Sequence, residues 1–339
     1  MLAILVVPAA DRLGRRWNIV SEPGGRRLNE GDFRRLSKFG GLSLFVSFTI
    51  SVLVAQALPI PRLDPYEVIR LVGLLLGGCI IFAAGLLDDL FHFRALPQFI
   101  GQSLAAAVAI AFQIFIEFFN NPFTGAQTEP WPFWVTVTIS YFWLVGMMNT
   151  VNFMDGLDGL AAGVAVIAGI MLFVNSAFRV EPPQTSVSLL HLALVGTSLG
   201  FLMFNFYPAR IFMGGGAVYL GYLLGALSII GGAKMATILL VMGLPLMDVV
   251  WQALNRLRLG RNPFEGDRGH VHFRLLDLGF SQRQIVLVYY LFCGFFGFLT
   301  LVTDSQFFKF IALGIMLVVV IGGFALVARG AQANSSSSS

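Results

Sequence analysis

Charged residues are scarce in this sequence. Asp, Glu, Lys and Arg make up 12% of its 339 residues, about half of the roughly 25% that is usual in soluble globular proteins. Hydrophobic residues make up 57%, and they form long uninterrupted runs. This composition excludes an ordinary soluble domain and indicates a polytopic membrane protein. The formal net charge of +4 does not indicate nucleic-acid binding, because the arginines gather in loops beside the apolar runs.

Cysteine and histidine are also rare. The two cysteines, Cys79 and Cys293, both lie in apolar runs, which is typical of small buried hydrophobic residues. They indicate neither a disulfide framework nor a cysteine metal site. Of the four histidines, His92 and His191 stand alone and receive no role, whereas the other two share a polar loop.

The apolar runs are long enough to cross a membrane as helices. Ten of them lie at 40–58, 69–87, 97–116, 132–151, 157–177, 188–206, 216–232, 234–254, 284–302 and 306–328. Residues 1–10 form a shorter apolar segment, which we interpret as the remainder of a truncated first helix. We therefore expect an all-α membrane bundle of about 10–11 helices, one domain over residues 1–330, and a disordered Ser-rich tail over 331–339.

Basic residues set the expected orientation. Most of the 22 Lys and Arg residues fall in alternate loops on one side of the membrane, and the positive-inside rule makes that side cytoplasmic. The N-terminus is then outside and the C-terminus cytoplasmic. The loops with unusual polar residues fall on the cytoplasmic side as well. Ionisable residues near the middle of the spans are few, with Asp248 the main exception, and this disfavours a secondary transporter.

Residues 149–160 form a polar stretch between two apolar runs. They include two amides, two carboxylates and two glycines, groups that are costly to bury in hydrocarbon. We therefore expect a helix end followed by a short loop. Asn, Asp and Gly are ordinary loop residues, but their density here favours a binding site.

Asp88 and Asp89 end another apolar run. Adjacent carboxylates are unfavourable unless something positive lies beside them, and Mg²⁺ commonly joins one or two carboxylates to substrate phosphates. A solvated helix end is the alternative interpretation. Together with Asp155, Asp158 and nearby arginines, these acids predict phosphoryl transfer. At a membrane surface, one reactant is then expected to be a lipid phosphate.

His270, His272 and Arg274 lie within a few residues of one another in the last polar loop. Two histidines without a third ligand nearby do not favour a structural zinc site. Imidazole and guanidinium groups are suited to binding a diphosphate or a sugar. A solvated basic loop is the alternative.

The ordered set of motifs resembles that of the bacterial polyprenyl-phosphate N-acetylhexosamine-1-phosphate transferases, relatives of the phospho-MurNAc-pentapeptide translocase. The motifs are Glu22-Pro23 to Arg27, Phe39-Gly40-Gly41, Asp88-Asp89, Asn-Phe-Met-Asp-Gly-Leu-Asp-Gly-Leu at 152–160, Phe-Asn-Phe-Tyr-Pro-Ala-Arg-Ile-Phe-Met-Gly at 204–214, Pro-Leu-Met-Asp at 245–248 and Gly-His-Val-His-Phe-Arg-Leu-Leu at 269–276. The resemblance implies transfer of a sugar 1-phosphate from a UDP-sugar to undecaprenyl phosphate at the cytoplasmic membrane, with release of UMP. It implies Mg²⁺, with Mn²⁺ as an alternative, and it leaves a homodimer open. The last motif is more similar to the N-acetylglucosamine branch, so UDP-N-acetylglucosamine is the expected donor.

The resemblance also implies roles for individual residues. Asp88 and Asp89 engage the lipid phosphate or the metal, with Asp88 the better candidate for the base. The expected metal ligands are Asn152 and Asp155. The expected uridine pocket consists of Asp158, Asn205 and Phe212, and the expected contacts to sugar or diphosphate are His270, His272 and Arg274.

The chain departs from the family pattern at Gly215. The family has an aspartate there, in a Gly-Asp-Ala-Gly-Ser motif, and that aspartate binds Mg²⁺. Leu96 and Gln98 stand in the region where the family commonly has lysines, and Phe273 replaces a family histidine. These changes fit either a re-formed site or a catalytically impaired relative that binds polyprenyl phosphate or a membrane partner. An aspartate restored at position 215 should distinguish the two, and Asp248 or Asp267 could fill the vacant place.

Overall fold

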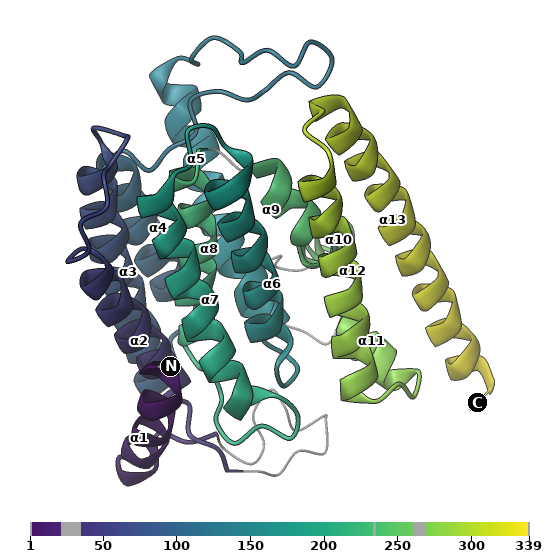
Figure 1. The fold of residues 1–339 in the computed structure, drawn as a ribbon. Coiled ribbons are helices and arrows are strands. Elements are labelled where there is room, and N and C mark those ends of the chain that lie inside the picture. The colour runs from purple at the N-terminus through teal and green to yellow at the C-terminus, as the bar shows by residue number, and fades with distance from the viewer. Residues whose placement is uncertain (1, 22–34, 233–234, 261–268, 338–339) are drawn as a thin grey trace.

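The computed structural model describes residues 2–21, 35–232, 235–260 and 269–337, with side chains described as far as residue 327. The described part consists of helices and connections, most of the helices running side by side (Figure 1). It contains no strand, only two isolated bridges, Val20 with Ser37 and Asn120 with Gln127. The predicted all-α class is confirmed.

The helices follow the predicted apolar runs. In chain order they are α1 (Leu2–Arg16), α2 (Gly40–Ala55), α3 (Glu67–Phe91), α4 (Ala95–Ala111), α5 (Phe133–Met154), α6 (Leu160–Val174), α7 (Thr185–Asn205), α8 (Gly216–Ile230), α9 (Met235–Val241), α10 (Gly243–Arg258), α11 (Val271–Asp277), α12 (Gln282–Val302) and α13 (Gln306–Ser337). A π-helical segment, Asn175–Arg179, extends α6. Helix α13 includes most of the tail for which disorder was predicted.

Six of these helices are long and apolar enough to cross a membrane: α3, α5, α6 with its π-helical extension, α7, α12 and α13. The pair α9 and α10 makes a seventh candidate if it is counted as one bent span. Helices α2, α4 and α8 are shorter apolar helices of 16, 17 and 15 residues. The chain is therefore a multi-pass membrane protein, and by helix length and composition the expected 10–11 spans become six or seven.

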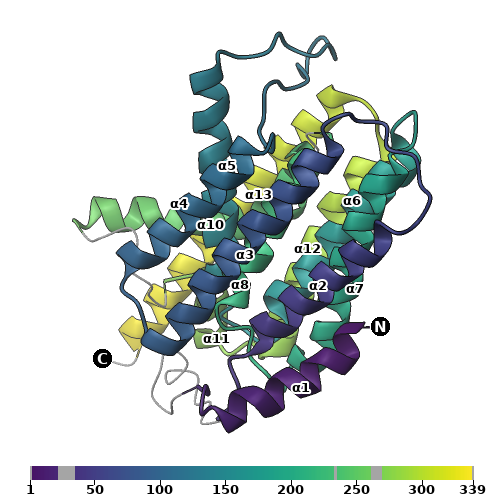
Figure 2. The same cartoon turned by 90° about the vertical axis from the view of Figure 1, so that its left-hand side faces the viewer.

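The span expected over residues 234–254 is not one continuous helix. Helices α9 and α10 are bent by 75° at a break between Val241 and Gly243. Pro245 explains the break, because its ring has no N–H and would clash with the carbonyl four residues earlier, where α9 ends. Helix α10 consequently points away from the bundle axis (Figure 2).

Helix α8 lies inside the bundle. Nearly all of its residues are buried, which is typical of a helix that is apolar on every side. Gly221 allows the close packing of α8 against α5, since a Cβ at this position would lie 2.6 Å from the carbonyl oxygen of Met147.

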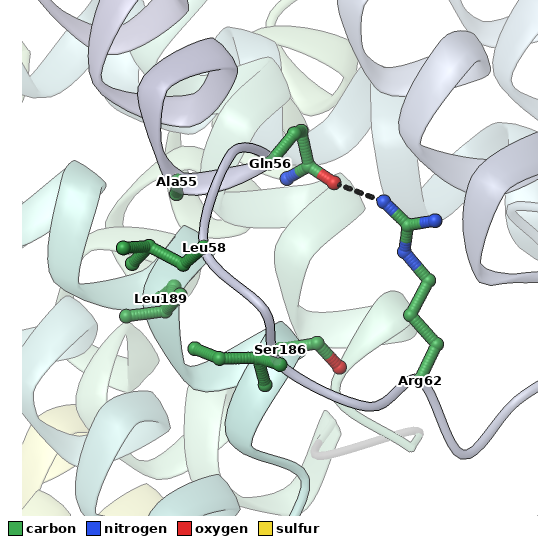
Figure 3. Close-up of a pocket in the computed structure, with 7 residues that line it drawn as sticks. Ala55, Gln56, Leu58, Arg62, Ser186 and Leu189 are labelled. Carbon is green, nitrogen blue, oxygen red and sulfur yellow. Dashed lines mark hydrogen bonds between the residues drawn. The ribbon is translucent and has the colours of Figure 1, made fainter.

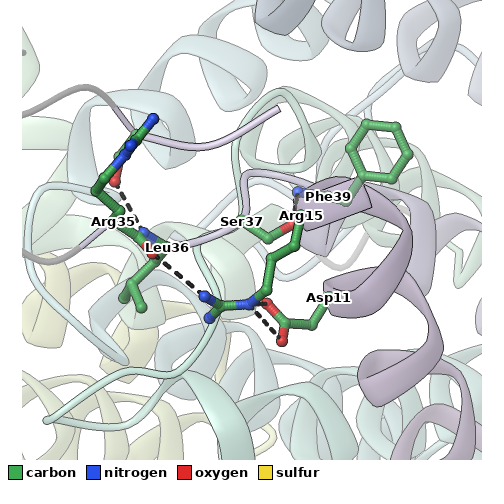
Figure 4. Close-up of polar contacts among 7 residues, drawn as sticks. Asp11, Arg15, Arg35, Leu36, Ser37 and Phe39 are labelled. Carbon is green, nitrogen blue, oxygen red and sulfur yellow. Dashed lines mark hydrogen bonds and ion pairs between the residues drawn. The ribbon is translucent and has the colours of Figure 1, made fainter. Parts of the chain in front are cut away.

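Helix α1 lies across one end of the bundle (Figure 2) and holds the segment that precedes α2. Arg15 Nε donates to both oxygens of Asp11, at 3.0 and 2.9 Å, and its Nη1 lies 3.5 Å from the carbonyl oxygen of Arg35 (Figure 4). Ser37 Oγ accepts from the backbone N–H of Phe39 at 3.1 Å. These contacts fix residues 35–39 at the entrance to α2.

The connections that carry the predicted site residues meet at this same end of the bundle, at the bottom of Figure 1. They are the α3–α4, α5–α6 and α7–α8 connections, together with α11. The expectation that the polar loops share one side is confirmed. The expected cytoplasmic location of this side, and the outside location of the N-terminus, stay predictions.

Candidate functional site

The two carboxylates at the end of α3 face different neighbours. Asp88 Oδ1 accepts a hydrogen bond from Gln98 Nε2 of α4 at 2.9 Å. Asp89 Oδ2 accepts one from the backbone N–H of Gly215, at the start of α8, at 2.6 Å. Adjacent residues on a helix do not share a face, so the pair divides its contacts between two helices. Both side chains remain partly exposed.

A basic pair lies next to these acids. The Nζ atom of Lys38 is 3.3 Å from Nε2 of His92, and both residues are exposed at this contact. Lys38 also interacts electrostatically with Asp89. His92 ends α3 in a left-handed conformation, with φ of 52°. Sequence analysis assigned His92 no role, although the four-residue spacing from Asp88 to His92 was a usable signal, because it places both on one face of the helix end.

Asn205 joins two of the connections. Its Oδ1 accepts from the backbone N–H of Gly159 at 3.1 Å, and its Nδ2 donates to the carbonyl oxygen of Ile211 at 2.9 Å. Tyr290, from α12, donates through its hydroxyl to the carbonyl oxygen of Gly159 at 2.6 Å. Gly159 has φ of +83°, a conformation that a side chain would strain. The α5–α6 and α7–α8 connections are thereby held as one unit.

The three residues predicted to form a uridine pocket come together in this unit. Asp158 is 1% exposed, and its Oδ2 accepts from the backbone N–H of Ala209 at 2.9 Å. Phe212 is buried with Leu36 and Ala209 in a small apolar cluster. Asp158 and Asn205 therefore shape the connections through backbone contacts. Their role in uridine binding stays a prediction.

The histidines predicted to contact the substrate are buried, so the interpretation of a solvated basic loop is wrong for them. His270 is 3% exposed and His272 is 1% exposed. Asp248 of α10 accepts from His270 Nδ1 at 2.9 Å through Oδ2, and from the backbone N–H of Val271 at 3.0 Å through Oδ1. The buried carboxylate of Asp248, which stood out in an apolar helix, thus holds the start of α11.

Helix α11 packs against the end of α5. The ring of His270 stacks on Phe153 with ring centroids 5.2 Å apart and on His272 with ring centroids 5.7 Å apart. A Cβ added to Gly156 would lie 2.5 Å from His272 Nε2, so the polar stretch and α11 are in direct contact. Arg274 Nε donates to the carbonyl oxygen of Gly269 at 2.8 Å, and this contact braces the segment that leads into α11.

The metal ligands predicted on α5 lie at its exposed end. Asn152 and Asp155 are three residues apart, which places them on neighbouring positions of the helix surface, and both are partly exposed. Within residues 2–21, 35–232, 235–260 and 269–337, no three His, Cys, Asp or Glu residues lie close enough to hold a metal ion.

Asp248, which was considered for the place opposite Asp155, does not fill it. The side chain of Asp248 is committed to His270 and Val271. Asp267 lies outside the described residues, as do Arg26, Arg27 and Arg34. Gly215 itself has no space for a side chain: a Cβ there would lie 2.2 Å from the carbonyl oxygen of Gly85.

The opposite end of the bundle is different. It carries a small pocket whose lining includes Gln56, Arg62 and Ser186 (Figure 3). Arg62 Nη2 donates to Gln56 Oε1 at 2.7 Å, and Ser186 Oγ donates to Glu67 Oε2 at 2.9 Å. None of the predicted site residues lines this pocket.

Comparison with known proteins identifies the family. Residues 71–232 match glycosyl transferase family 4. The chain is 29% identical over 313 residues to a probable undecaprenyl-phosphate N-acetylglucosaminyl 1-phosphate transferase of Bacillus subtilis, which covers 90% of this chain and 83% of the relative. It is 31% identical over 309 residues to a decaprenyl-phosphate N-acetylglucosaminephosphotransferase of Mycolicibacterium smegmatis, covering 84% and 75%. It is 31% identical over 320 residues to a phospho-N-acetylmuramoyl-pentapeptide-transferase of Desulforudis audaxviator, covering 86% and 90%. The chain therefore belongs to the bacterial polyprenyl-phosphate N-acetylhexosamine-1-phosphate transferases of glycosyl transferase family 4, and it is an enzyme of this type.

Proposed function

We propose that this protein transfers N-acetylglucosamine 1-phosphate from UDP-N-acetylglucosamine to undecaprenyl phosphate at the cytoplasmic membrane, as the first lipid-linked step of envelope polysaccharide synthesis. The observation that carries the proposal is the gathering of four acids, two buried histidines and a basic pair at one end of a membrane bundle. Relatives named for N-acetylglucosamine 1-phosphate transfer to polyprenyl phosphates support it. The proposal does not require a homodimer, which the family resemblance leaves open.

The reaction balances as a displacement at phosphorus. An oxygen of the lipid phosphate attacks the phosphorus that carries the sugar, and the bond from that phosphorus to the bridging oxygen breaks. UMP leaves with the electron pair, and the product is a lipid-linked sugar diphosphate. In phosphoryl transfer, catalysis is mainly positioning and charge stabilisation, so the protein must hold two anionic reactants together.

Asp88 is the residue that we assign to the acceptor. It lies where α3 emerges at the site end, it is partly exposed, and Gln98 holds one of its oxygens. It accepts the proton when the lipid phosphate is protonated. Lys38 and His92, with their nitrogens 3.3 Å apart, supply positive charge for the phosphate beside it. They would take the place of the lysines that the family commonly carries here.

The donor occupies the other side of the site. Phe212 supplies an aromatic face for uracil, and Asp158 and Asn205 hold the connection that bears it. His270, His272 and Arg274 contact the diphosphate or the sugar. Asp248 holds His270 through Nδ1, so Nε2 is the ring nitrogen that we assign to the substrate.

Mg²⁺ is the cofactor that we propose, with Mn²⁺ as a substitute, and Asn152 and Asp155 are its protein ligands. One carboxylate and one amide oxygen suit Mg²⁺, which typically takes one or two carboxylates and completes its shell with substrate phosphates and water. This donor set fits an ion that enters together with the diphosphate. When bound, the ion neutralises the charge that develops on the leaving phosphate.

The test uses membranes that contain the full chain, supplied with Mg²⁺, labelled UDP-N-acetylglucosamine and undecaprenyl phosphate. We expect a lipid-extractable sugar diphosphate and an equal amount of UMP. UDP-N-acetylmuramoyl-pentapeptide in place of the donor is expected to give no product, and product from it alone would reassign the donor. Because Gly215 stands where the family has an aspartate, a second candidate function is that of a catalytically impaired relative. Its signature would be binding of undecaprenyl phosphate without product, under conditions in which the Bacillus subtilis relative forms product.

A further inference from the structure

Helices α3 and α8 meet through backbone contact at two glycines. A Cβ added to Gly215 would lie 2.2 Å from the carbonyl oxygen of Gly85 and 2.5 Å from its Cα. A Cβ added to Gly85 would lie 2.6 Å from the carbonyl oxygen of Gly215. Because the obstructing atoms belong to the backbone, no rotation of a side chain relieves either clash. Neither position accepts a side chain without separation of the two helices.

The carboxylate of Asp89, one turn after Gly85 on α3, binds the backbone of Gly215 beside this contact. Its Oδ2 is 2.6 Å from the backbone N–H of Gly215, which is otherwise one of the unpaired donors at the start of α8. The backbone of Gly214 passes close to Asp89 Oδ2 in a left-handed conformation, with φ of +57°. A Cβ added to Gly214 would lie 2.4 Å from that oxygen. A hydrogen bond from a helix N-terminus to a carboxylate is favoured by charge and by the helix dipole.

The entrance of α2 is tied to the same turn. Gly40 N–H donates to the carbonyl oxygen of Phe212 at 3.0 Å, and Gly41 N–H donates to that of Met213 at 2.9 Å. The segment that bears Phe212 is therefore fixed between α2 and α8, and Asp89 fixes the start of α8 relative to α3.

We propose that Asp89 is a positioning residue and not a ligand of substrate or metal: it holds the start of α8 against α3, and Gly85 and Gly215 make that contact possible. In this chain, the place of the family aspartate is closed by backbone packing, and the carboxylate of Asp248 is held instead by His270 and Val271. This inference rests on the proposed function, because the segment that Asp89 positions is the one assigned to the nucleotide.

The first test compares Asp89→Asn with Asp89→Ala in the full chain. Asparagine keeps an oxygen that accepts from Gly215, so Asp89→Asn is expected to retain activity within about tenfold of wild type. Alanine removes the acceptor and is expected to lower kcat/KM about 10- to 100-fold. The loss should appear mainly as a raised KM for UDP-N-acetylglucosamine, with the KM for undecaprenyl phosphate nearly unchanged. If Asp89→Asn is as inactive as Asp89→Ala, or if the KM for the lipid rises instead, Asp89 contacts substrate or metal and the inference is wrong.

The second test examines the glycine contact by substitution. Gly215→Ala and Gly215→Asp are both expected to lower the thermal unfolding temperature in detergent and the activity. Gly146→Ala in α5 is the matched control, since no atom lies within 4 Å of a Cβ added there. A gain of activity in Gly215→Asp, or a stability equal to that of Gly146→Ala, would overturn the inference. Wild-type protein without activity would contradict the proposed function instead, and the stability comparison would still test the contact.

Discussion

The two ends of the bundle use polar residues in different ways. At the site end, buried groups bond across long stretches of chain, as in the contacts of Asp158 with Ala209 and of Asp248 with His270. At the opposite end, the ion pair of Arg179 with Asp304 is largely exposed on the Asp304 side, at 81%. Groups that are buried and bonded are costly to disturb, whereas exposed pairs contribute little. The predicted site residues are therefore held by buried polar contacts, whereas the Arg179–Asp304 pair joins an exposed connection, although Ser186 and Glu67 form one partly buried contact at that end as well.

The largest effect is expected from Asp88→Asn. Loss of a carboxylate that acts as a base typically costs about 10²- to 10⁴-fold in rate, so kcat should fall within that range. Initial rates at saturating concentrations of both substrates measure it. The neighbouring Asp89→Asn is the control, and equal losses in the two variants would contradict the division of roles between the two acids.

A smaller but clear loss is expected from Asp248→Ala. Without its partner, His270 is no longer held in place, and misplacement by about 1 Å can cost about 10²-fold in activity. The double variant with His270→Ala should lose less than the sum of the two single losses, because the two residues share a contact, although Asp248 also holds the backbone N–H of Val271. Additive losses in this double-mutant cycle would show that Asp248 acts independently of His270.

Asn205→Ala tests the link between the α5–α6 and α7–α8 connections. It leaves the backbone groups of Gly159 and Ile211 without a partner, at a cost of roughly 1–3 kcal/mol for each buried group. We expect a lower unfolding temperature in detergent and a raised KM for the donor. Wild-type values for both quantities would show that this link does not support the site.

The smallest effect is expected at the opposite end. Arg179→Gln removes the pair with Asp304, in which the nitrogen and oxygen are 2.7 Å apart. An exposed pair contributes about 0.2–1 kcal/mol, and the activity should stay within about twofold of wild type. A loss similar to that of Asp248→Ala would break the comparison between the two ends.

Much of the fold was predictable, because long apolar runs and loop charges are local properties of the sequence. The break between α9 and α10 was missed, although Pro245 gave a local signal for it. The sequence predicted that the site residues lie at one end of the bundle only because alternate loops between membrane spans lie on the same side of the membrane.

The individual contacts were not predictable. Lys38 and His92 are 54 positions apart, and no periodic pattern relates them. The sequence shows that Gly215 lacks a ligand, but only the packing against Gly85 shows that a side chain has no room there. The aspartate restoration that appeared decisive from the sequence becomes, in the structure, a test of helix contact.

The most direct test of the account is UMP release by purified protein from UDP-N-acetylglucosamine, with and without undecaprenyl phosphate, for wild type, Asp88→Asn and Arg179→Gln. We predict release that requires the lipid and equals the sugar-phosphate found on it. The rate should fall about 10²- to 10⁴-fold in Asp88→Asn and persist in Arg179→Gln. Release without the lipid, or full release by Asp88→Asn, would contradict the claim that this end of the bundle performs the transfer.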